Sequence, residues 1–243
     1  MSKETINKVI EALKGMSMGL EIDYDNLKYG IISHPLTSNV YVVTKDKSFM
    51  MLNSENVEEY VNWRCNELTN HAKDVTSVFV HVNKPYRIPL LSFVAQYLDD
   101  KEFSDLLSWI WTSTEFPHQE SIFKLVDMFK RARKDLLMDG EELRVLESLP
   151  SIVTIYRGLQ SADAKRRGLS WTLSLDKAKW FANRWARKGE VLRAEIPKDA
   201  IFMYTNSRGE EEVVVNPFRL QNLKTMEVAD VEKITNHAKK DAD

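Results

Sequence analysis

The chain has 243 residues, of which 43% are hydrophobic and 29% are charged, a balance that is ordinary for a soluble globular protein. Its 34 Lys and Arg residues nearly cancel its 36 Asp and Glu residues, and the formal net charge is −2. This balance excludes a global field that would draw the protein to nucleic acid or to an anionic membrane. The single cysteine, Cys65, excludes an internal disulfide framework and indicates a reducing compartment.

The first segment, MSKETINKVIEALKG, predicts an amphipathic helix rather than an export signal, because its apolar residues recur at helical spacing. These residues are Ile6, Val9, Ile10 and Leu13. No window contains the roughly 18 apolar residues that a membrane span needs. We therefore expect a cytoplasmic protein, or one that is delivered into a host cytoplasm.

The next segments predict a mixed region followed by a helical one. Residues 40–44 (VYVVT) predict a strand, a helix is expected from about residue 54, and residues 75–82 (VTSVFVHV) predict a second strand. From residue 88 to about 149 the pattern is dominantly helical. Its two apolar stripes are Phe103, Leu106, Leu107 and Ile110, and then Ile122, Phe123, Val126, Phe129 and Ala132. The basic run KRARK (130–134) ends a helix, where cations complement the helix dipole, so we do not expect nucleic-acid binding there.

The last third is rich in predicted strands. They are expected at 153–159, 169–174, 190–196, 200–204 and 211–215, with one helix at 176–188 that Gly189 closes. Within this helix one face gathers Ala178, Phe181, Ala182 and Trp185, which are most simply core residues. Residues 235–243 (TNHAKKDAD) are expected to be disordered. The sequence therefore predicts an α+β protein with a mainly helical first half, divided between residues 88 and 89.

Several common functional motifs are absent from the sequence. The five histidines are scattered, and none has the spacing of a zinc site, so we expect no metal. There is no GxGxxG, phosphate loop or GxSxG elbow, and the Rossmann, nucleoside-triphosphatase and hydrolase interpretations therefore lack their motifs.

A constellation of polar residues remains in the last third. It comprises an arginine and a glycine at the end of a strand, two hydroxyl residues two positions apart, and two glutamates two positions apart. These are Tyr156, Arg157 and Gly158, then Ser170 and Thr172, then Glu210 and Glu212. Because residues i and i+2 of a strand share a face, Glu210 and Glu212 should point together and Glu211 away from them.

Taken in order, these residues resemble the arginine, serine, glutamate class of mono-ADP-ribosyltransferases, of the bacterial or phage type. GLSWTLSLDKAKWFA resembles that family's serine strand and following helix, and EEEVVVNP resembles its glutamate strand. The resemblance covers roughly residues 150–217. Two departures are Trp171, where a small residue is usual between the hydroxyls, and the short interval from Arg157 to Glu212.

The resemblance implies a compact core of two packed small β-sheets with flanking helices, with NAD as the substrate. Residues 89–243 would form the catalytic domain, with a helical wall at 89–148 and a strand-rich core at 149–230, and residues 1–88 an α+β region of unknown role. The implied catalytic residues are Glu212, Glu210, Arg157 and Ser170, and the implied NAD-binding residues are Arg157, Gly158, Ser170, Thr172 and Glu212.

The chemistry of the residues agrees with these roles. Cleavage of the bond between nicotinamide and ribose develops positive charge on the ribose, which a carboxylate such as Glu212 stabilises. Arg157 suits a pyrophosphate or the nearby ribose, and Glu210 suits a base that activates an acceptor. In the family, a glutamate at the position of Glu210 accompanies transfer to protein arginine. The loop 205–209 (TNSRG) would face this acceptor, with Tyr204 as its nearest aromatic residue.

Three alternatives stay open at the level of sequence. The protein could be an NAD glycohydrolase, with water as the acceptor, or a non-catalytic binding module that keeps the fold. Each polar residue could also be an ordinary one, such as an ion-pair partner, a strand hydroxyl or the polar end of an edge strand. A toxin-like or phage effector role is compatible with the family but is not indicated by any of these residues.

Overall fold

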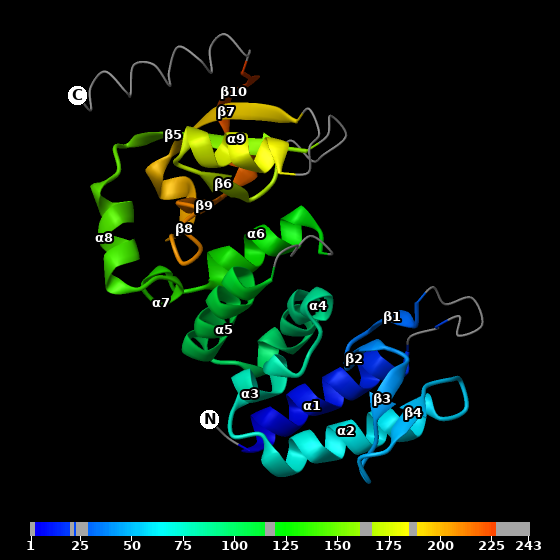
Figure 1. Cartoon of the computed structure of the whole chain (residues 1–243). Coiled ribbons are helices and arrows are strands. Elements are labelled where there is room, and N and C mark those ends of the chain that lie inside the picture. Colours follow the sequence, from blue (N-terminus) through cyan, green and yellow to red (C-terminus); the bar gives the residue numbers. More distant parts are fainter. Residues whose placement is uncertain are drawn as a thin grey trace. The chain divides into compact units, whose positions relative to one another are not determined.

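The computed structural model describes residues 3–19, 22, 29–114, 120–160, 167–184 and 189–226 (Figure 1). Its contacts divide the chain into two compact units. Unit 1 comprises Met1–Ser121 and Arg131–Arg133, and unit 2 comprises Ile122–Lys130 and Lys134–Asp243. The boundary expected between residues 88 and 89 would fall inside one helix, α4 (Lys84–Val94), which packs against other helices of unit 1; the contacts divide the chain after Ser121.

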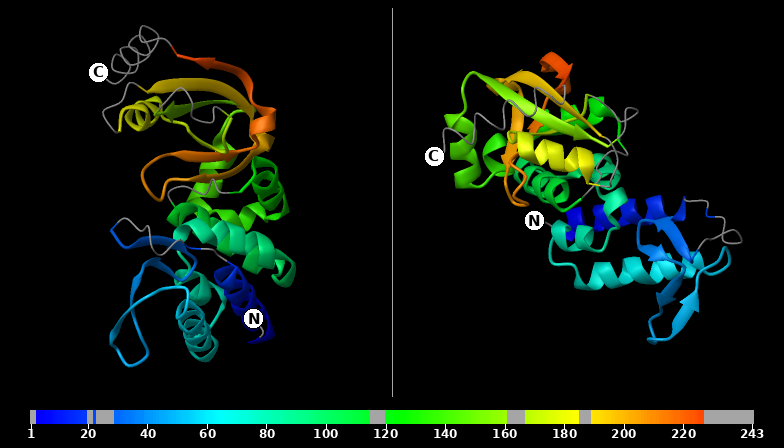
Figure 2. Two further views of the ribbon diagram at one scale, coloured as in Figure 1. Left: turned by 90° about the vertical axis from the view of Figure 1, so that its right-hand side faces the viewer. Right: turned by 45° about the horizontal axis from the view of Figure 1, so that its top comes forward.

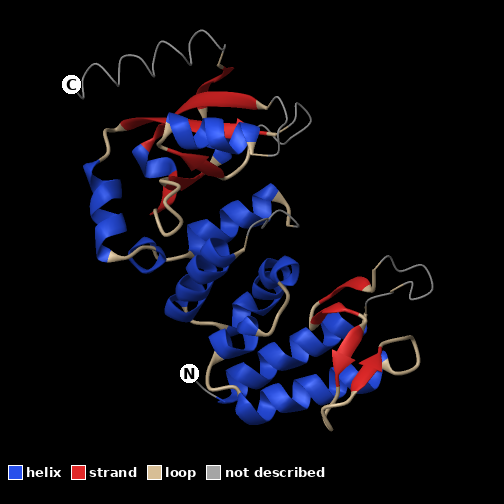
Figure 3. Cartoon of the chain, in the orientation of Figure 1, coloured by secondary structure: helices blue, strands red, loops and turns tan. Residues whose placement is uncertain are grey.

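Unit 1 is a set of helices with two short antiparallel hairpins (Figure 3). Its elements are α1 (Lys3–Met18), β1 (Ile31–His34), β2 (Thr37–Asn39), β3 (Tyr41–Val43), β4 (Phe49–Met51), α2 (Val57–His71), α3 (Val75–Val80), α4 (Lys84–Val94), η1 (Ala95–Tyr97) and α5 (Asp100–Ser113). Helix α1 packs against α2, α3 and α4, and α4 packs against α5. All four apolar residues that predicted the first helix are buried in α1, which confirms that prediction.

The strand expected at 75–82 is wrong, because this segment forms helix α3. Asp74 begins the helix as a capping box: its side chain accepts from the Ser77 amide at 2.7 Å, while the Asp74 amide donates to Ser77 Oγ at 3.2 Å. Val75, Val78 and Phe79 are then buried at i, i+3 and i+4. The capping side chain and this spacing outweigh the strand propensity of the valines.

Arg131, in the basic run at 130–134, contributes to packing within unit 1. Arg131 donates to the carbonyls of Ala95 and Leu98 at 2.7 and 2.9 Å, and its guanidinium lies 4.2 Å from the centre of the Phe103 ring. This arginine therefore satisfies carbonyl groups of the η1 segment and covers an aromatic side chain.

Unit 2 contains helices followed by the strand-rich region. Its elements are α6 (Ile122–Arg131, whose last residue belongs to unit 1), α7 (Lys134–Leu137), α8 (Gly140–Ser148), β5 (Ile152–Leu159), β6 (Ser170–Thr172), α9 (Leu175–Asn183), β7 (Glu190–Pro197), η2 (Lys198–Ala200), β8 (Ile201–Thr205), β9 (Glu212–Val215), η3 (Pro217–Arg219) and β10 (Gln221–Thr225). The five strands expected here are all present, as is the helix, of which residues 185–188 lie outside the described residues. Residues 235–243, expected to be disordered, also lie outside them.

The strands of unit 2 form one antiparallel sheet in the order β10-β7-β5-β6-β9-β8. We expected two separate sheets, but the two halves are joined through a single residue pair, Tyr156 and Thr172, between β5 and β6. By contrast, β5 pairs with β7 along its whole length, from Ile152 to Leu159. The strand pairing within each three-stranded half is therefore longer than the pairing at the junction between the halves.

The apolar stripes of the helices are largely buried, although Ile122 and Ala132 are half-buried and Phe123 is exposed. Phe103, Leu106, Leu107 and Ile110 are buried in α5, as are Val126 and Phe129 in α6. Phe123 was predicted to belong to the second stripe but is 66% exposed, and it stacks on Phe218 with ring centres 5.0 Å apart. Its position near the start of α6 places it beside a surface aromatic of the same unit.

Helix α9 lies against the sheet beside β5 and β7 (Figure 2). The approach is closest at Gly158 in β5, where an added Cβ would lie 2.1 Å from the Ala178 carbonyl oxygen and 2.6 Å from the Ala182 amide nitrogen. Ala178 and Ala182 are themselves buried. Small residues on both elements therefore allow the helix backbone to pack directly on the strand.

Replacing Gly158 with alanine should destabilise unit 2, because the new methyl group meets helix backbone rather than a movable side chain. We expect the free energy of unfolding to fall by about 1–3 kcal/mol, measured by urea denaturation. Gly140→Ala is the matched control, since nothing lies within 4 Å of its Cβ position. Equal stability of the two variants would contradict the packing role of Gly158.

Candidate functional site

The register of the sheet places the predicted residues of β5, β6 and β9 close together at the junction between β5 and β6. Thr172 of β6 pairs with Tyr156 of β5 on one side and with Glu212 of β9 on the other. Arg157 directly follows Tyr156, and Ser170 begins β6. Residues that are far apart in the sequence are therefore brought to one place by strand pairing.

Arg157 is the central cation of this cluster. Its Nη1 donates to the backbone carbonyl of Ser170, so it connects β5 with β6 beside the single residue pair. Its Nε is buried and has no hydrogen-bond partner in the described part of the chain. Burial lowers the pKa of Arg157 to about 10, and the negative charge of Glu212 acts in the opposite direction. Arg157 therefore remains positively charged at neutral pH.

Gly168 provides the space that the guanidinium of Arg157 occupies. A Cβ at this position would lie 2.6 Å from Nη1 and 2.7 Å from Cζ and Nη2 of Arg157. The Gly168 carbonyl in turn accepts from the indole nitrogen of Trp171 at 2.8 Å. Trp171 is buried, so this departure from the family pattern is a core residue that supports the turn before Ser170.

The two predicted glutamates converge on one arginine. Nη2 of Arg208 lies 3.1 Å from Oε2 of Glu210 and 3.1 Å from Oε2 of Glu212. The Glu212 side chain is only 5% exposed, whereas those of Glu210 and Arg208 are 22% and 36% exposed. The carboxylate pair therefore has one buried and one accessible member, joined by a cation from the preceding loop.

Glu210 and Glu212 do lie at the same place, but the cause differs from the strand alternation that predicted it. Strand β9 begins only at Glu212, and Glu211 adopts a left-handed backbone conformation with φ of 47°. Its carbonyl accepts from the Leu173 amide at 3.0 Å, and its amide donates to Asn206 Oδ1 at 3.1 Å. A backbone turn at Glu211, rather than the pleat of a strand, therefore brings its two neighbours to the same arginine.

Thr172 holds this turn through its side chain. Its hydroxyl donates to the Glu210 carbonyl at 2.7 Å and accepts from the Ser174 amide at 3.0 Å. Because Thr172 is also paired with Glu212 in the sheet, it determines the position of both glutamates. Thr172 therefore contacts the backbone of both glutamates.

The electrostatic surroundings of Glu210 favour its protonated form. Burial is the largest cause of its raised pKa, and the negative charge of Glu212 acts in the same direction. The positive charges of Arg208 and Arg184 lower the pKa, but they do not offset these effects completely. A raised pKa makes the Glu210 carboxylate a stronger base than an ordinary glutamate, which suits the uptake of a proton.

The remaining predicted residues have mainly structural contacts. Gly158 allows the close approach of α9, and Ser170 contacts Arg157 through its carbonyl rather than its hydroxyl. Phe181 is half-buried and packs edge-on against Trp180, with ring centres 5.0 Å apart. Tyr204 was expected to face an acceptor, but it is buried, and its hydroxyl pKa is raised mainly by that burial.

Sequence reasoning missed two residues of the site, Arg208 and Gly168. Arg208 stands two and four positions before the glutamates, and this spacing could have indicated an ion pair. Gly168 stands two positions before Ser170, but the need for a glycine depends on an arginine from another strand. No local sequence signal shows that requirement.

Comparisons of the chain with protein-family models, curated proteins and solved structures give no match. Within the residues that the structure describes, no group of three or more His, Cys, Asp or Glu side chains is placed to hold a metal ion. No described helix is long and apolar enough to cross a membrane. Support for a function therefore comes from the geometry of the cluster and from the residue pattern of the sequence.

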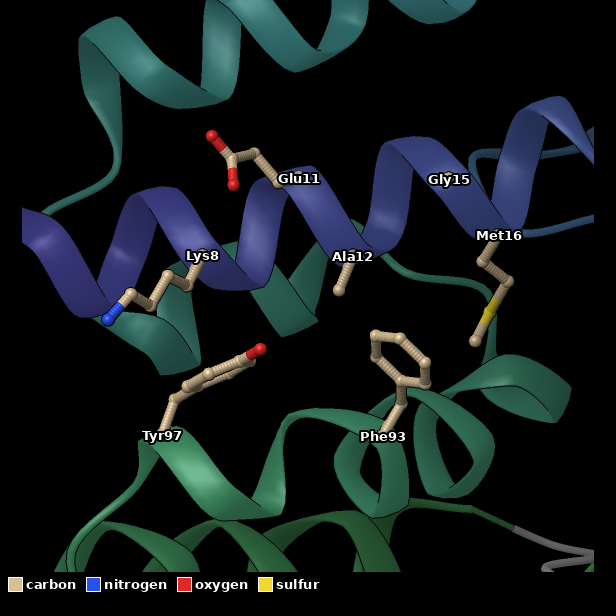
Figure 4. Close-up of a pocket in the computed structure, with 7 residues that line it drawn as sticks. All are labelled: Lys8, Glu11, Ala12, Gly15, Met16, Phe93 and Tyr97. Carbon is tan, nitrogen blue, oxygen red and sulfur yellow. The ribbon is translucent and has the colours of Figure 1, made fainter.

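A separate groove of about 560 Å³ lies within unit 1, between α1 and the α4–η1 segment (Figure 4). Its lining residues are Lys8, Glu11, Ala12, Gly15, Met16, Phe93 and Tyr97. Phe93 is 62% exposed, and Nζ of Lys8 lies 5.3 Å from the centre of the Tyr97 ring. The groove is mainly apolar and contains none of the residues of the cluster in unit 2.

Gly168→Ala should displace the guanidinium of Arg157, because the added methyl group would overlap it. We expect the free energy of unfolding to fall by about 1–3 kcal/mol and the NMR signal of Arg157 Nε–Hε to shift. Gly140→Ala serves again as the control. An unchanged Arg157 signal in Gly168→Ala would show that the guanidinium does not occupy the space beside this glycine.

Arg208→Ala should raise the pKa of Glu210 further, because Arg208 is the largest influence that lowers it. A raised pKa means that the folded protein binds this proton more tightly than the unfolded chain does. The contribution of Glu210 to the free energy of unfolding is therefore present at low pH and is lost as the pH rises through its folded-state pKa. In Arg208→Ala this contribution should be lost at a higher pH than in the wild type. Titration of the Glu210 side-chain carboxyl by ¹³C NMR, assigned with Glu210→Gln, measures the shift. A lower pKa in Arg208→Ala would contradict the ion pair.

Proposed function

We propose that unit 2 is an NAD-dependent mono-ADP-ribosyltransferase that releases nicotinamide and transfers ADP-ribose to an acceptor. The observation that carries the proposal is the meeting of Arg157, Ser170 and Glu212, from three separate strands, at the narrow junction of the sheet. Strand pairing thus brings together the three residue types on which the family resemblance rests.

The residues of the cluster fit the chemical groups of NAD. Arg157 is cationic and has a buried Nε without a partner among the described residues, and an oxygen of the pyrophosphate or ribose would satisfy this donor. Gly168 leaves the guanidinium the space that it needs. Glu212 presents a buried carboxylate, for which a ribose hydroxyl is a suitable hydrogen-bond donor.

The reaction would use the two carboxylates differently. The bond between the ribose carbon and the nicotinamide nitrogen breaks, and nicotinamide leaves with the electron pair. Glu212 stabilises the positive charge that develops on the ribose, and its low exposure makes that interaction stronger than it would be in water. The acceptor nitrogen then forms a bond to the same carbon and loses a proton to Glu210, whose raised pKa suits a base.

For the acceptor we propose protein arginine. The resemblance associates a glutamate at position 210 with arginine modification, and the contact with Arg208 supports this assignment. One nitrogen of a guanidinium lies 3.1 Å from each carboxylate, so the pair accommodates the chemical group that would be modified.

An assay with NAD labelled in its adenine moiety tests the proposal. The protein is incubated with labelled NAD and with arginine-rich acceptor proteins, and nicotinamide release and protein labelling are measured separately. We expect both. Nicotinamide release without labelling would indicate water as the acceptor and an NAD glycohydrolase, and the absence of both would refute an NAD-cleaving enzyme.

Glu212→Gln and Glu212→Ala should each lower the rate of nicotinamide release at least about hundredfold, because charge stabilisation in the transition state is lost. Glu211→Ala should retain nearly full activity, since the described contacts of Glu211 in the turn are made by its backbone amide and carbonyl. Initial rates measured side by side, with circular dichroism to check folding, compare them. A folded Glu212→Gln variant with wild-type activity would show that the catalytic assignment is wrong.

A further inference from the structure

We propose that Arg208 is an internal competitor for the acceptor position: its guanidinium occupies the Glu210 and Glu212 carboxylates and must leave before an external guanidinium can bind there. The inference rests on the proposed function, because it assumes that these carboxylates receive the acceptor. It adds a residue that the family resemblance does not include.

The contact between Arg208 and the two carboxylates has the geometry of an ion pair that another cation can displace. Only one nitrogen of Arg208, Nη2, is shared between the two carboxylates, at 3.1 Å from each. An arginine that is bound through two parallel hydrogen bonds to one carboxylate is held more firmly than one that shares a single nitrogen. The side chain is also 36% exposed, so water screens the interaction. Arg208 can therefore be displaced at a modest energetic cost.

The loop that carries Arg208 is held by its backbone on both sides of this residue. The Asn206 amide donates to Glu142 Oε1 at 3.1 Å, and the Gly209 amide donates to the Asn206 carbonyl at 2.8 Å. Gly209 adopts φ of 64°, and nothing lies within 4 Å of its Cβ position. The guanidinium can thus move by rotation of its own side chain, while the loop and the glutamates keep their places.

The consequence is a lower apparent affinity for external guanidinium groups. A ligand binds only the fraction of molecules in which Arg208 has left the carboxylates, and its apparent Kd increases accordingly. Removing Arg208 makes the pair available in every molecule. The same side chain would make the protein selective for acceptors that present an arginine with additional contacts around it.

The test is an NMR titration with ethylguanidine, a small molecule that reproduces the end of an arginine side chain. We expect Arg208→Ala to bind it about fivefold more tightly than the wild type, or more. Arg219→Ala is the matched control, because Arg219 pairs with Asp199 at 3.5 Å, outside the carboxylate pair. Adding Glu210→Gln to Arg208→Ala should abolish the gain, because the second carboxylate contact is lost.

Arg219→Ala separates competition from a general change in charge, because it removes one positive charge from the same unit but leaves the occupant of the carboxylate pair in place. Competition predicts tighter ethylguanidine binding in Arg208→Ala and wild-type affinity in Arg219→Ala. An equal gain in the two variants would show a field effect and overturn the inference. Equal affinity in Arg208→Ala and the wild type would also overturn it.

The outcome can be distinguished from that of the proposed function. A gain in ethylguanidine binding without nicotinamide release by any variant would support competition for the carboxylates and refute the enzymatic proposal. Nicotinamide release by the wild type without any gain in ethylguanidine binding would support the enzymatic proposal and refute competition by Arg208. Thermal unfolding of each variant confirms that the compared proteins are folded.

Discussion

The junction between β5 and β6 is the interaction on which the candidate site depends. One residue pair, Tyr156 and Thr172, joins the two halves of the sheet, and the guanidinium of Arg157 bonds to the Ser170 carbonyl beside it. A partly buried arginine is costly unless nearby groups compensate its charge, and Glu212 supplies a compensating charge here. The connection of the sheet and the electrostatics of the cluster therefore rely on the same side chain.

The turn at Glu211 determines how the carboxylates are presented. A non-glycine residue with positive φ costs on the order of 1 kcal/mol, and the hydrogen bonds from Leu173 and to Asn206 offset that cost. The result is a buried carboxylate at Glu212 next to a more accessible carboxyl group at Glu210. The pKa of Glu210 is raised. Different environments for two neighbouring acids are a common way to give them different chemical roles.

Local patterns predicted much of unit 2, because its strands and helix carry strong signals. The run VVV and the alternation in β5 and β7 require burial on a sheet, and the strands formed where expected. The segment 75–82 shows where such reasoning fails, since β-branched residues also occur at helical spacing and an aspartate cap decides between the two. The exposure of Phe123 shows that periodicity locates a helix face better than its ends.

From sequence order alone it was possible to identify Arg157, Ser170 and the glutamates as candidates, because the order of residue types and their flanking patterns are local information. The tertiary structure decided what these residues touch: Gly168 as the space for a guanidinium, Thr172 as the anchor of the turn, and Arg208 as the partner of both carboxylates. Those contacts depend on strand register and on a left-handed turn. Both arise from packing between segments distant in the chain, which no short stretch of sequence encodes.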